Sequence, residues 1–312
     1  MRTCLAMISM LLGAALAAAQ QPPARPKGSE EPAFQLPAGV EVERDLVYAR
    51  YGARELKLDL YRPASGEGPF PGIVFIHGGG WRGGNRSAFR RQAAHLAAKG
   101  FVGAAIEYRL SGEAAYPAAV HDAKAAVRWM RANAAKYRIN PDKIGAAGGS
   151  AGGHLVSLLG TTAAIRELEG EGGNSGFSSR VQAVAAFNPA LDLITPERQP
   201  GNAQEAVRGF LGGPYEKMPG AYAQASPITH AGKASAPHLF LHGTADATVP
   251  YQQSVDMQKK LRAAGVRAEL FTAEGAPHGF YNRPPHFQPT LERMEQFFQS
   301  VLGGKTPAAT GQ

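Results

Sequence analysis

A serine with small neighbours on both sides lies in the segment Gly148-Gly149-Ser150-Ala151-Gly152, which matches the pattern Gly-x-Ser-x-Gly. In this pattern the serine occupies a sharp turn between a strand and a helix, where small residues are needed because chain segments approach closely. The apolar residues before this turn are typical of a buried strand, and the residues after it are typical of a helix. The sequence therefore predicts Ser150 as a nucleophile at the end of a strand.

An acid and a base that could activate this serine follow two later apolar runs. Asp246 follows the run that ends at Leu241, and His278 follows the run that ends at Phe271. The chain order Ser150, Asp246, His278 is the order expected of α/β-hydrolases, and residues that follow parallel strands meet at one edge of a sheet. We therefore expect a triad in which His278 accepts the serine proton and Asp246 orients the imidazole.

Another acid, Asp192, follows the apolar run 181–187 and is the alternative third member of the triad. Asp256 is expected on the solvated face of a helix. Among the other histidines, His242 is predicted to be a structural residue beside the acid, and His154 a core or wall residue. Asp122 is expected to pair with Arg109.

Three glycines in the segment His77-Gly78-Gly79-Gly80-Trp81 follow the apolar run 73–76. Glycines leave backbone N–H groups open to a substrate oxygen, and no Gly-Lys-Ser/Thr follows that would indicate a phosphate-binding loop. We expect the amides of Gly79, Gly80 and Ala151 to form an oxyanion hole. Trp81 is interpreted either as a flat surface for a sugar or aromatic ring or as a core residue.

The elements that must position these residues alternate between strand and helix. Strands are expected at 40–48, 55–60, 73–76, 101–107, 143–147, 181–187, 237–241 and 267–271. Helices are expected at 87–99, 118–137, 151–161, 254–264 and 287–302. This alternation predicts the α/β class, with a mostly parallel central sheet and helices on both faces. The proline-rich segment 188–236, with one short helix near 203–210, is interpreted as a lid-like insertion.

The ends of the chain differ in composition from this catalytic domain, which we place at 38–303. Residues 1–19 combine Arg2, an apolar stretch and three consecutive alanines, which is typical of a signal peptide. The segment 20–37 is predicted to be a flexible lead-in, and 304–312 a flexible tail. The apolar stretch is short for a membrane span. We expect a secreted or periplasmic protein with no membrane span after cleavage.

Composition limits the partners and cofactors that we expect. The single cysteine, Cys4, lies in the predicted leader, so disulfides and thiolate metal sites are excluded from the mature chain. No His-Glu-x-x-His or comparable spacing is present, so we expect no metal and no organic cofactor. The net charge of +8 comes without a basic run containing interleaved aromatic residues, which favours a solubilising surface over nucleic-acid binding.

On these motifs the chain resembles the α/β-hydrolase superfamily, and within it the bacterial esterases of the feruloyl- and acetyl-xylan-esterase-like type. The resemblance covers roughly residues 40–302 and includes the glycine loop, the nucleophile turn, 108–110, 122–129, 225–228, 242–249 and 278–280. It implies Ser150, Asp246 and His278 as the catalytic residues. Hormone-sensitive-lipase-type esterases share the glycine motif but usually carry a larger N-terminal cap than the short lead-in here.

The motifs and the resemblance together predict an esterase for short-acyl or aromatic carboxylic esters, with acetyl or feruloyl esters of plant polysaccharide as the expected substrates. A general carboxylesterase or lipase of small lipid esters is the alternative. A prolyl-oligopeptidase-like peptidase is disfavoured because such enzymes usually carry a large gating domain. A catalytically inactive binding protein is disfavoured because all three triad residues are present.

Overall fold

The apolar runs of the sequence form the strands of one sheet in the structure, a computed structural model that describes residues 34–195 and 201–303. The sheet has eight strands within these residues: β1 (Val40–Tyr51), β2 (Arg54–Pro63), β3 (Phe70–Ile76), β4 (Val102–Ile106), β5 (Ile139–Gly149), β6 (Ala183–Phe187), β7 (His238–Gly243) and β8 (Ala268–Ala273). The predicted signal peptide, most of the lead-in and the tail from 304 lie outside the described residues.

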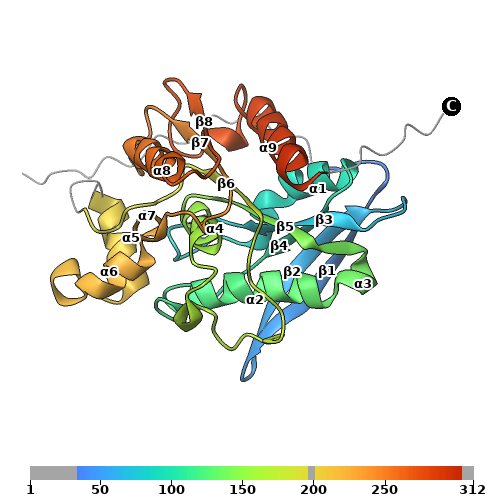
Figure 1. Ribbon diagram of the computed structural model, residues 1–312, viewed down its shortest axis with the longest axis horizontal. Helices are drawn as coiled ribbons and strands as arrows, with labels where there is room; N and C mark the ends of the chain where they lie inside the picture. Colours follow the sequence, from blue (N-terminus) through green and yellow to red (C-terminus); the bar gives the residue numbers. More distant parts are fainter. Residues whose placement is uncertain (1–33, 196–200, 304–312) are drawn as a thin grey trace, which may run out of the picture. The chain divides into compact units, whose positions relative to one another are not determined.

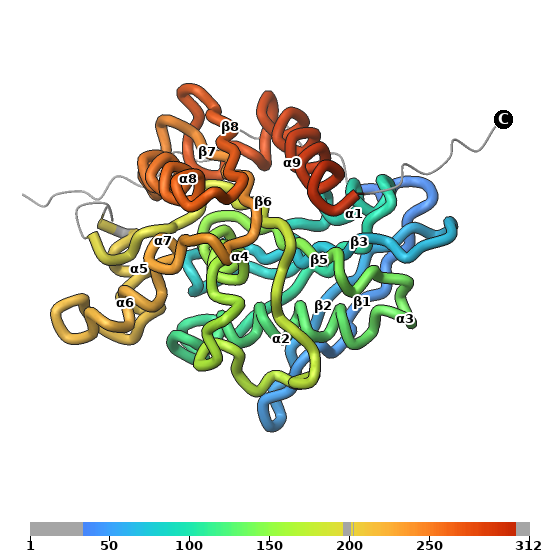
Figure 2. The backbone as a smooth tube through the Cα atoms, in the orientation of Figure 1, coloured from blue at the N-terminus to red at the C-terminus, as the bar shows by residue number. Residues whose placement is uncertain are grey.

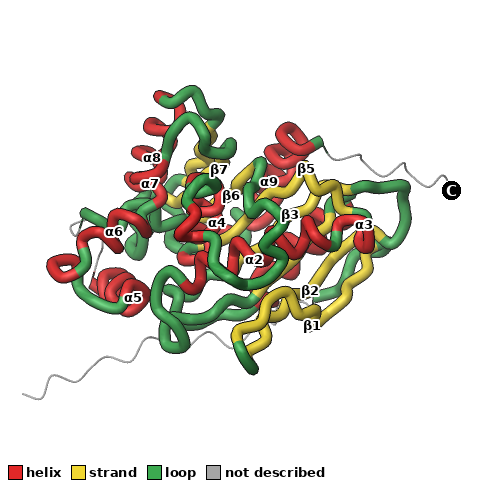
Figure 3. The backbone as a smooth tube through the Cα atoms, turned by 60° about the horizontal axis from the view of Figure 1, so that its bottom comes forward, coloured by secondary structure: helices red, strands yellow, loops and turns green. Residues whose placement is uncertain are grey.

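The strand order is β1-β2-β4-β3-β5-β6-β7-β8, and β2 pairs antiparallel with both of its neighbours while the other pairs are parallel. Strands β4 and β6 are buried along their whole length, as expected for parallel strands covered on both faces. The predicted α/β class with a mostly parallel sheet is confirmed. Figure 3 shows the strands as one group with β1 and β2 at its edge.

The helices between the strands are α1 (Arg90–Ala98), α2 (Ala118–Ala132), α3 (Ala134–Tyr137), α4 (Ala151–Thr161), α5 (Gly201–Leu211), α6 (Pro219–Ala225), α7 (Pro227–His230), α8 (Gln252–Ala263) and α9 (Phe287–Leu302). Short 3₁₀ turns are η1 (Arg86–Phe89), η2 (Arg166–Leu168), η4 (Tyr215–Lys217) and η5 (Phe280–Asn282). The expected helix at 118–137 is in fact two helices, because the chain bends at Asn133, whose side chain donates to the carbonyl of Trp129.

The order of the strands determines which face of the sheet each helix covers. Strand β4 lies on one side of β3 and β5 lies on the other, so the right-handed crossovers through α1 and α2 place these helices on opposite faces. Helix α9 lies beside α1, where Glu295 contacts His95 at 2.6 Å (Figure 1). Because β4 and β5 lie on opposite sides of β3, the direction of winding reverses between β3 and β5. Ligands in α/β proteins bind at the carboxyl ends of the strands at such a point.

The segment 188–236 contains more helix than the single short one that the sequence indicated. Besides α5, it forms α6 and α7, which begin at Pro219 and Pro227. Proline is favoured in the first turn of a helix because the N–H groups there have no acceptor within the helix, so a residue without an N–H loses no hydrogen bond. These prolines therefore begin helices. Helices α5, α6 and α7 lie together near α4 and α8 and away from β1 and β2 (Figure 2).

Candidate active site

The turn between β5 and α4 presents Ser150 in a strained backbone conformation, with φ 54° and ψ −119°. A Cβ atom on Gly152 would collide with the carbonyl oxygen of Ile76, at the end of the neighbouring strand β3. Glycine is thus required where the first turn of α4 passes this strand. The amide of Ser150 donates to the carbonyl of Phe187 at 2.9 Å, which attaches the turn to the end of β6.

The structure brings Ser150 together with the two residues that the sequence paired with it. The Nε2 atom of His278 lies 3.0 Å from the Oγ atom of Ser150, and its Nδ1 atom lies 2.7 Å from the Oδ2 atom of Asp246. His278 follows β8 and Asp246 follows β7, so three strand ends contribute one residue each. This geometry permits proton transfer from the hydroxyl to the imidazole while the carboxylate holds the ring.

The carboxylate of Asp246 is completely buried, with no exposed side-chain surface. Burial alone would raise its pKa, but hydrogen bonds from His242, His278 and the amide of Val249 lower the pKa below its ordinary value. A second backbone amide, that of Thr248, also donates to Oδ1, at 2.8 Å. The carboxylate therefore stays ionised and keeps one orientation.

Two further residues lie beside this triad: His242, which was predicted to be a structural residue beside the acid, and Asn188, which was not singled out from the sequence. The Nε2 atom of His242 lies 3.2 Å from the same Oδ2 atom of Asp246. Asn188, fully buried, accepts a hydrogen bond from the amide of Gly279 and places its Nδ2 atom 3.4 Å from Nε2 of His278. In the sequence, the spacing of four residues between His242 and Asp246 indicates that this histidine lies near the acid. The position of Asn188 directly after β6 could have indicated that it lies beside the triad.

Asp192, the alternative acid, makes other contacts. Its Oδ1 atom accepts from the amide of Ile194 at 2.9 Å, and its Oδ2 atom accepts from the hydroxyl of Thr195 at 2.7 Å. These bonds belong to a local turn of the kind that aspartate forms with residues shortly after it. The structure therefore places Asp246, rather than Asp192, against His278.

The glycine loop after β3 lies next to the nucleophile. Gly79 has a φ of +117°, which favours glycine, and a Cβ atom there would collide with the carbonyl oxygen of Gly83. Among the described residues, no acceptor receives a hydrogen bond from the amides of Gly79 and Gly80. Ala151 is the first residue of α4, where the helix offers its amide no acceptor. All three predicted oxyanion donors remain available to a ligand.

Trp81 is packed into the core and also lines the cavity over Ser150, so its role as a surface for a substrate ring stays a prediction. Its indole is only 4% exposed and stacks on Phe210 of α5, with ring centroids 4.6 Å apart. Its Nε1 atom donates to Nδ1 of His154 at 3.2 Å. Because Nδ1 accepts this bond, the imidazole carries its proton on Nε2, which donates to the carbonyl of Ala225. The predicted core role of His154 is confirmed. Aromatic packing against α5 leaves little of the indole exposed.

A cavity of about 490 Å³ opens over Ser150 and His278. Its wall is mostly apolar and combines Trp81 and Tyr281 with small side chains, namely Ala88, Ala190, Ala203, Ala206, Val207 and Val249. Polar atoms at this cavity come from Arg82, Thr248 and Asn282. Helix α5 supplies three of the small residues, so the segment 188–236 contributes directly to the wall of the site.

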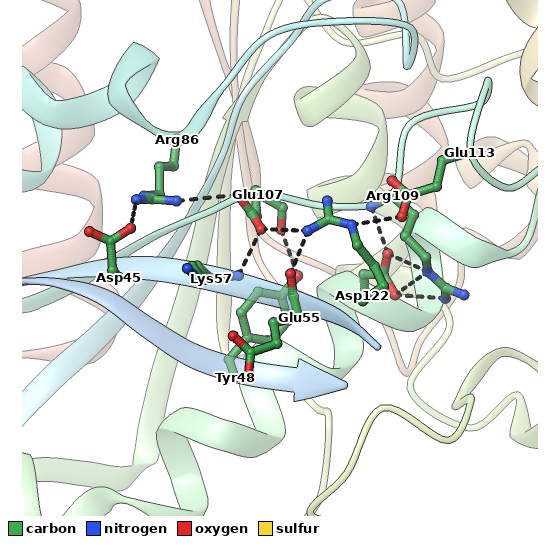
Figure 4. Close-up of polar contacts among 10 residues, drawn as sticks. Asp45, Tyr48, Glu55, Lys57, Arg86, Glu107, Arg109, Glu113 and Asp122 are labelled. Carbon is green, nitrogen blue, oxygen red and sulfur yellow. Dashed lines mark hydrogen bonds and ion pairs between the residues drawn. The ribbon is translucent and has the colours of Figure 1, made fainter. Parts of the chain in front are cut away.

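Arg86, which follows the glycine loop, belongs to a charged network (Figure 4). Arg86 donates to Asp59 at 2.8 Å and to Glu107 at 3.2 Å, and it also pairs with Asp45. These acids lie on or beside β1, β2 and β4, so η1 is tied to the sheet. A larger hollow of about 610 Å³ is lined by this network, but Ser150 and His278 do not line it.

A second ion pair in the same view fixes the start of α2. Asp122 is fully buried and accepts from the guanidinium of Arg109 at 2.7 Å (Figure 4), as the sequence predicted. The backbone amide of Arg109 donates to the same carboxylate at 2.8 Å. The pair joins the loop after β4 to α2 and takes no part in the cavity over Ser150.

Residues 34–195 and 201–303 contain no group of three or more acidic, histidine or cysteine side chains that could hold a metal ion. No helix described in the structure is both long enough and apolar enough to cross a membrane. The described site brings together a serine, a histidine and a carboxylate beside the backbone amides of the glycine loop.

Comparison with known proteins agrees with this geometry. The family model described as BD-FAE matches residues 58–261, and the model described as TAP-like protein matches residues 216–307. The probable carboxylic ester hydrolase LipM of Mycobacterium tuberculosis is 34% identical over 82% of this chain and 61% of its own length. The chain spans 53% to 63% of the length of this protein and of the mycobacterial esterases LipC and LipQ.

Solved structures of esterases are also similar. Native Est2, a thermophilic esterase of Thermogutta terrifontis, has a TM-score of 0.73 at 33% identity, and the match covers 88% of this chain and 96% of that one. Est2 has been solved with propionate bound, with butyrate bound and phosphonylated by sarin. A truncated carbohydrate esterase from gut microbiota has a TM-score of 0.74 at 28% identity, covering 84% of this chain and 96% of that chain.

Proposed function

The chain belongs to the BD-FAE family, within the α/β-hydrolase esterases, and from this premise we propose that it is a serine esterase that hydrolyses short-acyl or aromatic carboxylic esters. The observation that carries the proposal is the hydrogen-bonded series Asp246–His278–Ser150 at the mouth of an apolar cavity. Gly79 and Gly80, whose amides have no hydrogen-bond acceptor among the described residues, line the same cavity.

In the proposed mechanism His278 accepts the hydroxyl proton as the Oγ atom of Ser150 attacks the ester carbonyl carbon. The amides of Gly79, Gly80 and Ala151 donate to the oxyanion that forms. His278 then gives the proton to the departing alcohol oxygen, which leaves an acyl-serine. Water attacks this ester with the same histidine as base, and the carboxylic acid is released. Asp246 holds the imidazole and balances its positive charge through both steps.

The likeness to an esterase solved with short carboxylates supports the proposed preference for short acyl groups, and α5 forms part of the wall beside which the acyl group would lie. Ala203, Ala206 and Val207 on α5 face the cavity beside the glycine loop. The similar esterase Est2 has been solved with propionate and with butyrate, which are short carboxylates of the kind that such an enzyme releases. This likeness favours chains of two to four carbons over long fatty acyl chains.

We propose further that the esters are carried on polysaccharide and met outside the cytoplasm. The similarity to a carbohydrate esterase from gut microbiota supports the first part. The composition of residues 1–19, which is typical of a signal peptide, supports the second. Acetylated xylan and methyl ferulate are the two substrates that represent the acetyl and feruloyl forms of this proposal.

Ser150→Ala tests the mechanism. We expect the variant to lose ester hydrolysis while it keeps its fold, because the side chain lies at the surface of the turn. A serine-directed phosphonate should add one group to the wild-type protein, on Ser150, and none to the variant, as measured by intact mass and peptide mapping. A similar esterase is phosphonylated by sarin. Near-normal turnover by folded Ser150→Ala would refute the mechanism.

A further inference from the structure

We infer that His242 is a positioning residue of the reaction, which acts through Asp246 as a second imidazole on the carboxylate. The inference rests on the proposed function. His242 is fully buried at the end of β7. Its polar contacts are with Asp246, Val249 and Ser254, and its ring also lies against Tyr251. Among these, Asp246 is the residue that contacts His278.

The two imidazoles converge on one oxygen of the carboxylate. Oδ2 of Asp246 lies 2.7 Å from Nδ1 of His278 and 3.2 Å from Nε2 of His242. The other oxygen, Oδ1, accepts the backbone amides of Thr248 and Val249, both at 2.8 Å. Oδ1 thus has two amide donors, Oδ2 has His278 as donor with His242 close by, and the carboxylate cannot rotate without breaking at least one hydrogen bond.

The contacts of His242 determine which of its nitrogens carries the proton. The carbonyl oxygen of Val249 lies 3.0 Å from Nε2, and a carbonyl oxygen can only accept. The Nε2 atom must therefore be protonated and donate to this carbonyl, while Oδ2 of Asp246 lies 3.2 Å from the same nitrogen. The Oγ atom of Ser254, on α8, lies 2.7 Å from Nδ1 and can donate its proton there.

The chain Ser254–His242–Asp246–His278–Ser150 is therefore one continuous series of contacts from α8 to the nucleophile. A buried carboxylate oxygen that loses a polar partner is less well satisfied, and fewer contacts then hold its orientation. Reorientation of Asp246 would move the imidazole of His278 away from the serine. Because small displacements of reacting groups can cost about 100-fold in rate, loss of the His242 N–H should appear mainly in kcat.

The test compares two substitutions of His242 on a nitrophenyl acetate substrate. His242→Gln keeps an N–H donor at nearly the same distance from the backbone, and His242→Leu fills similar space without one. We expect His242→Leu to lower kcat by about 10- to 100-fold with KM changed less than about twofold, and His242→Gln to recover most of kcat. Equal kcat for wild type and folded His242→Leu would overturn the inference.

A double-mutant cycle separates positioning from a general packing role. In the Asp246→Asn background, His242→Leu should cause no further loss of kcat, because the group through which it acts is already changed. The same fold-loss in both backgrounds would mean that His242 contributes only packing, and would overturn the inference. Melting temperatures of all variants are measured alongside.

Ser254→Ala provides a second test in case His242→Leu does not fold. This change removes the hydroxyl that contacts Nδ1 and leaves both histidines in place, so we expect a smaller fall in kcat with KM maintained. An unchanged kcat in Ser254→Ala would count against the series of contacts. A wild-type protein that neither hydrolyses esters nor reacts with the phosphonate would refute the proposed function. An active enzyme that keeps its kcat in His242→Leu would refute only the role of His242.

Discussion

Trp81 and Phe210 stack with their rings 4.6 Å apart and inclined by 16°, which joins the glycine loop to helix α5. The indole also donates to His154 on the helix that follows the nucleophile. Aromatic pairs of this kind contribute about 0.5–1.5 kcal/mol beyond the area that they bury. The helix that forms part of the cavity wall is thus held against the catalytic elements themselves, and its inward face should govern which acyl groups fit.

Ala206 tests this role of α5, because its Cβ atom lies 3.5 Å from the position that a Cβ on Gly80 would occupy. We expect Ala206→Leu to reduce kcat/KM for butyrate and hexanoate esters at least tenfold more than for acetate, since the added side chain occupies cavity volume. Nitrophenyl esters of increasing length measure this. Gly209→Leu places the same side chain on the exposed face of α5 and should leave the profile unchanged. Equal losses for acetate and hexanoate would contradict the assignment of this wall.

Asp246→Asn tests the choice of acid. The amide cannot hold His278 in the required tautomer, and in a serine protease the equivalent change costs about 10⁴-fold in kcat. We expect a loss of several orders of magnitude with little change in KM. The matched control is Asp192→Asn, whose carboxylate contacts Ile194 and Thr195 and should have a mild effect. A severe loss from the control together with a mild loss from Asp246→Asn would reverse the assignment.

Acyl chain length tests the proposed substrate class. Activity should fall as the acyl group lengthens from two carbons towards eight or more. A long apolar channel would add about 0.8 kcal/mol of binding for each buried methylene, and rates would then rise with length. The measurement is kcat/KM across a series of nitrophenyl esters, with acetylated xylan and methyl ferulate alongside. A maximum at long chains would indicate a lipase of lipid esters.

Stability should depend on pH through His154. Burial lowers its pKa from 6.5 to about 4 in the folded protein. As pH falls, the unfolded chain therefore takes up the proton first, and stability that is complete above pH 6.5 is lost progressively down to about pH 4. The full loss is on the order of 3 kcal/mol. Urea unfolding at pH 7 and pH 4.5 should show a smaller decrease for His154→Gln than for wild type. Identical decreases would rule out His154 as a source.

Much of the site was predictable from sequence because the relevant signals are local. A strand followed by a tight turn requires small residues, so Gly148, Ser150 and Gly152 could be interpreted without tertiary information. Alternation of buried apolar runs with amphipathic helices predicted the α/β class, and the ends of successive parallel strands predicted that Asp246 and His278 would approach Ser150.

Tertiary structure alone decided which side chains share a contact. The sequence offered two acids, and the packing of β7 against β8 brought Asp246 to His278 while a local turn occupied Asp192. It also decided that Trp81 is buried, since α5 folds onto the indole from a segment far along the chain. Periodicity and turn residues describe how each segment folds, whereas these contacts depend on strand order and helix placement, for which a single segment carries no signal.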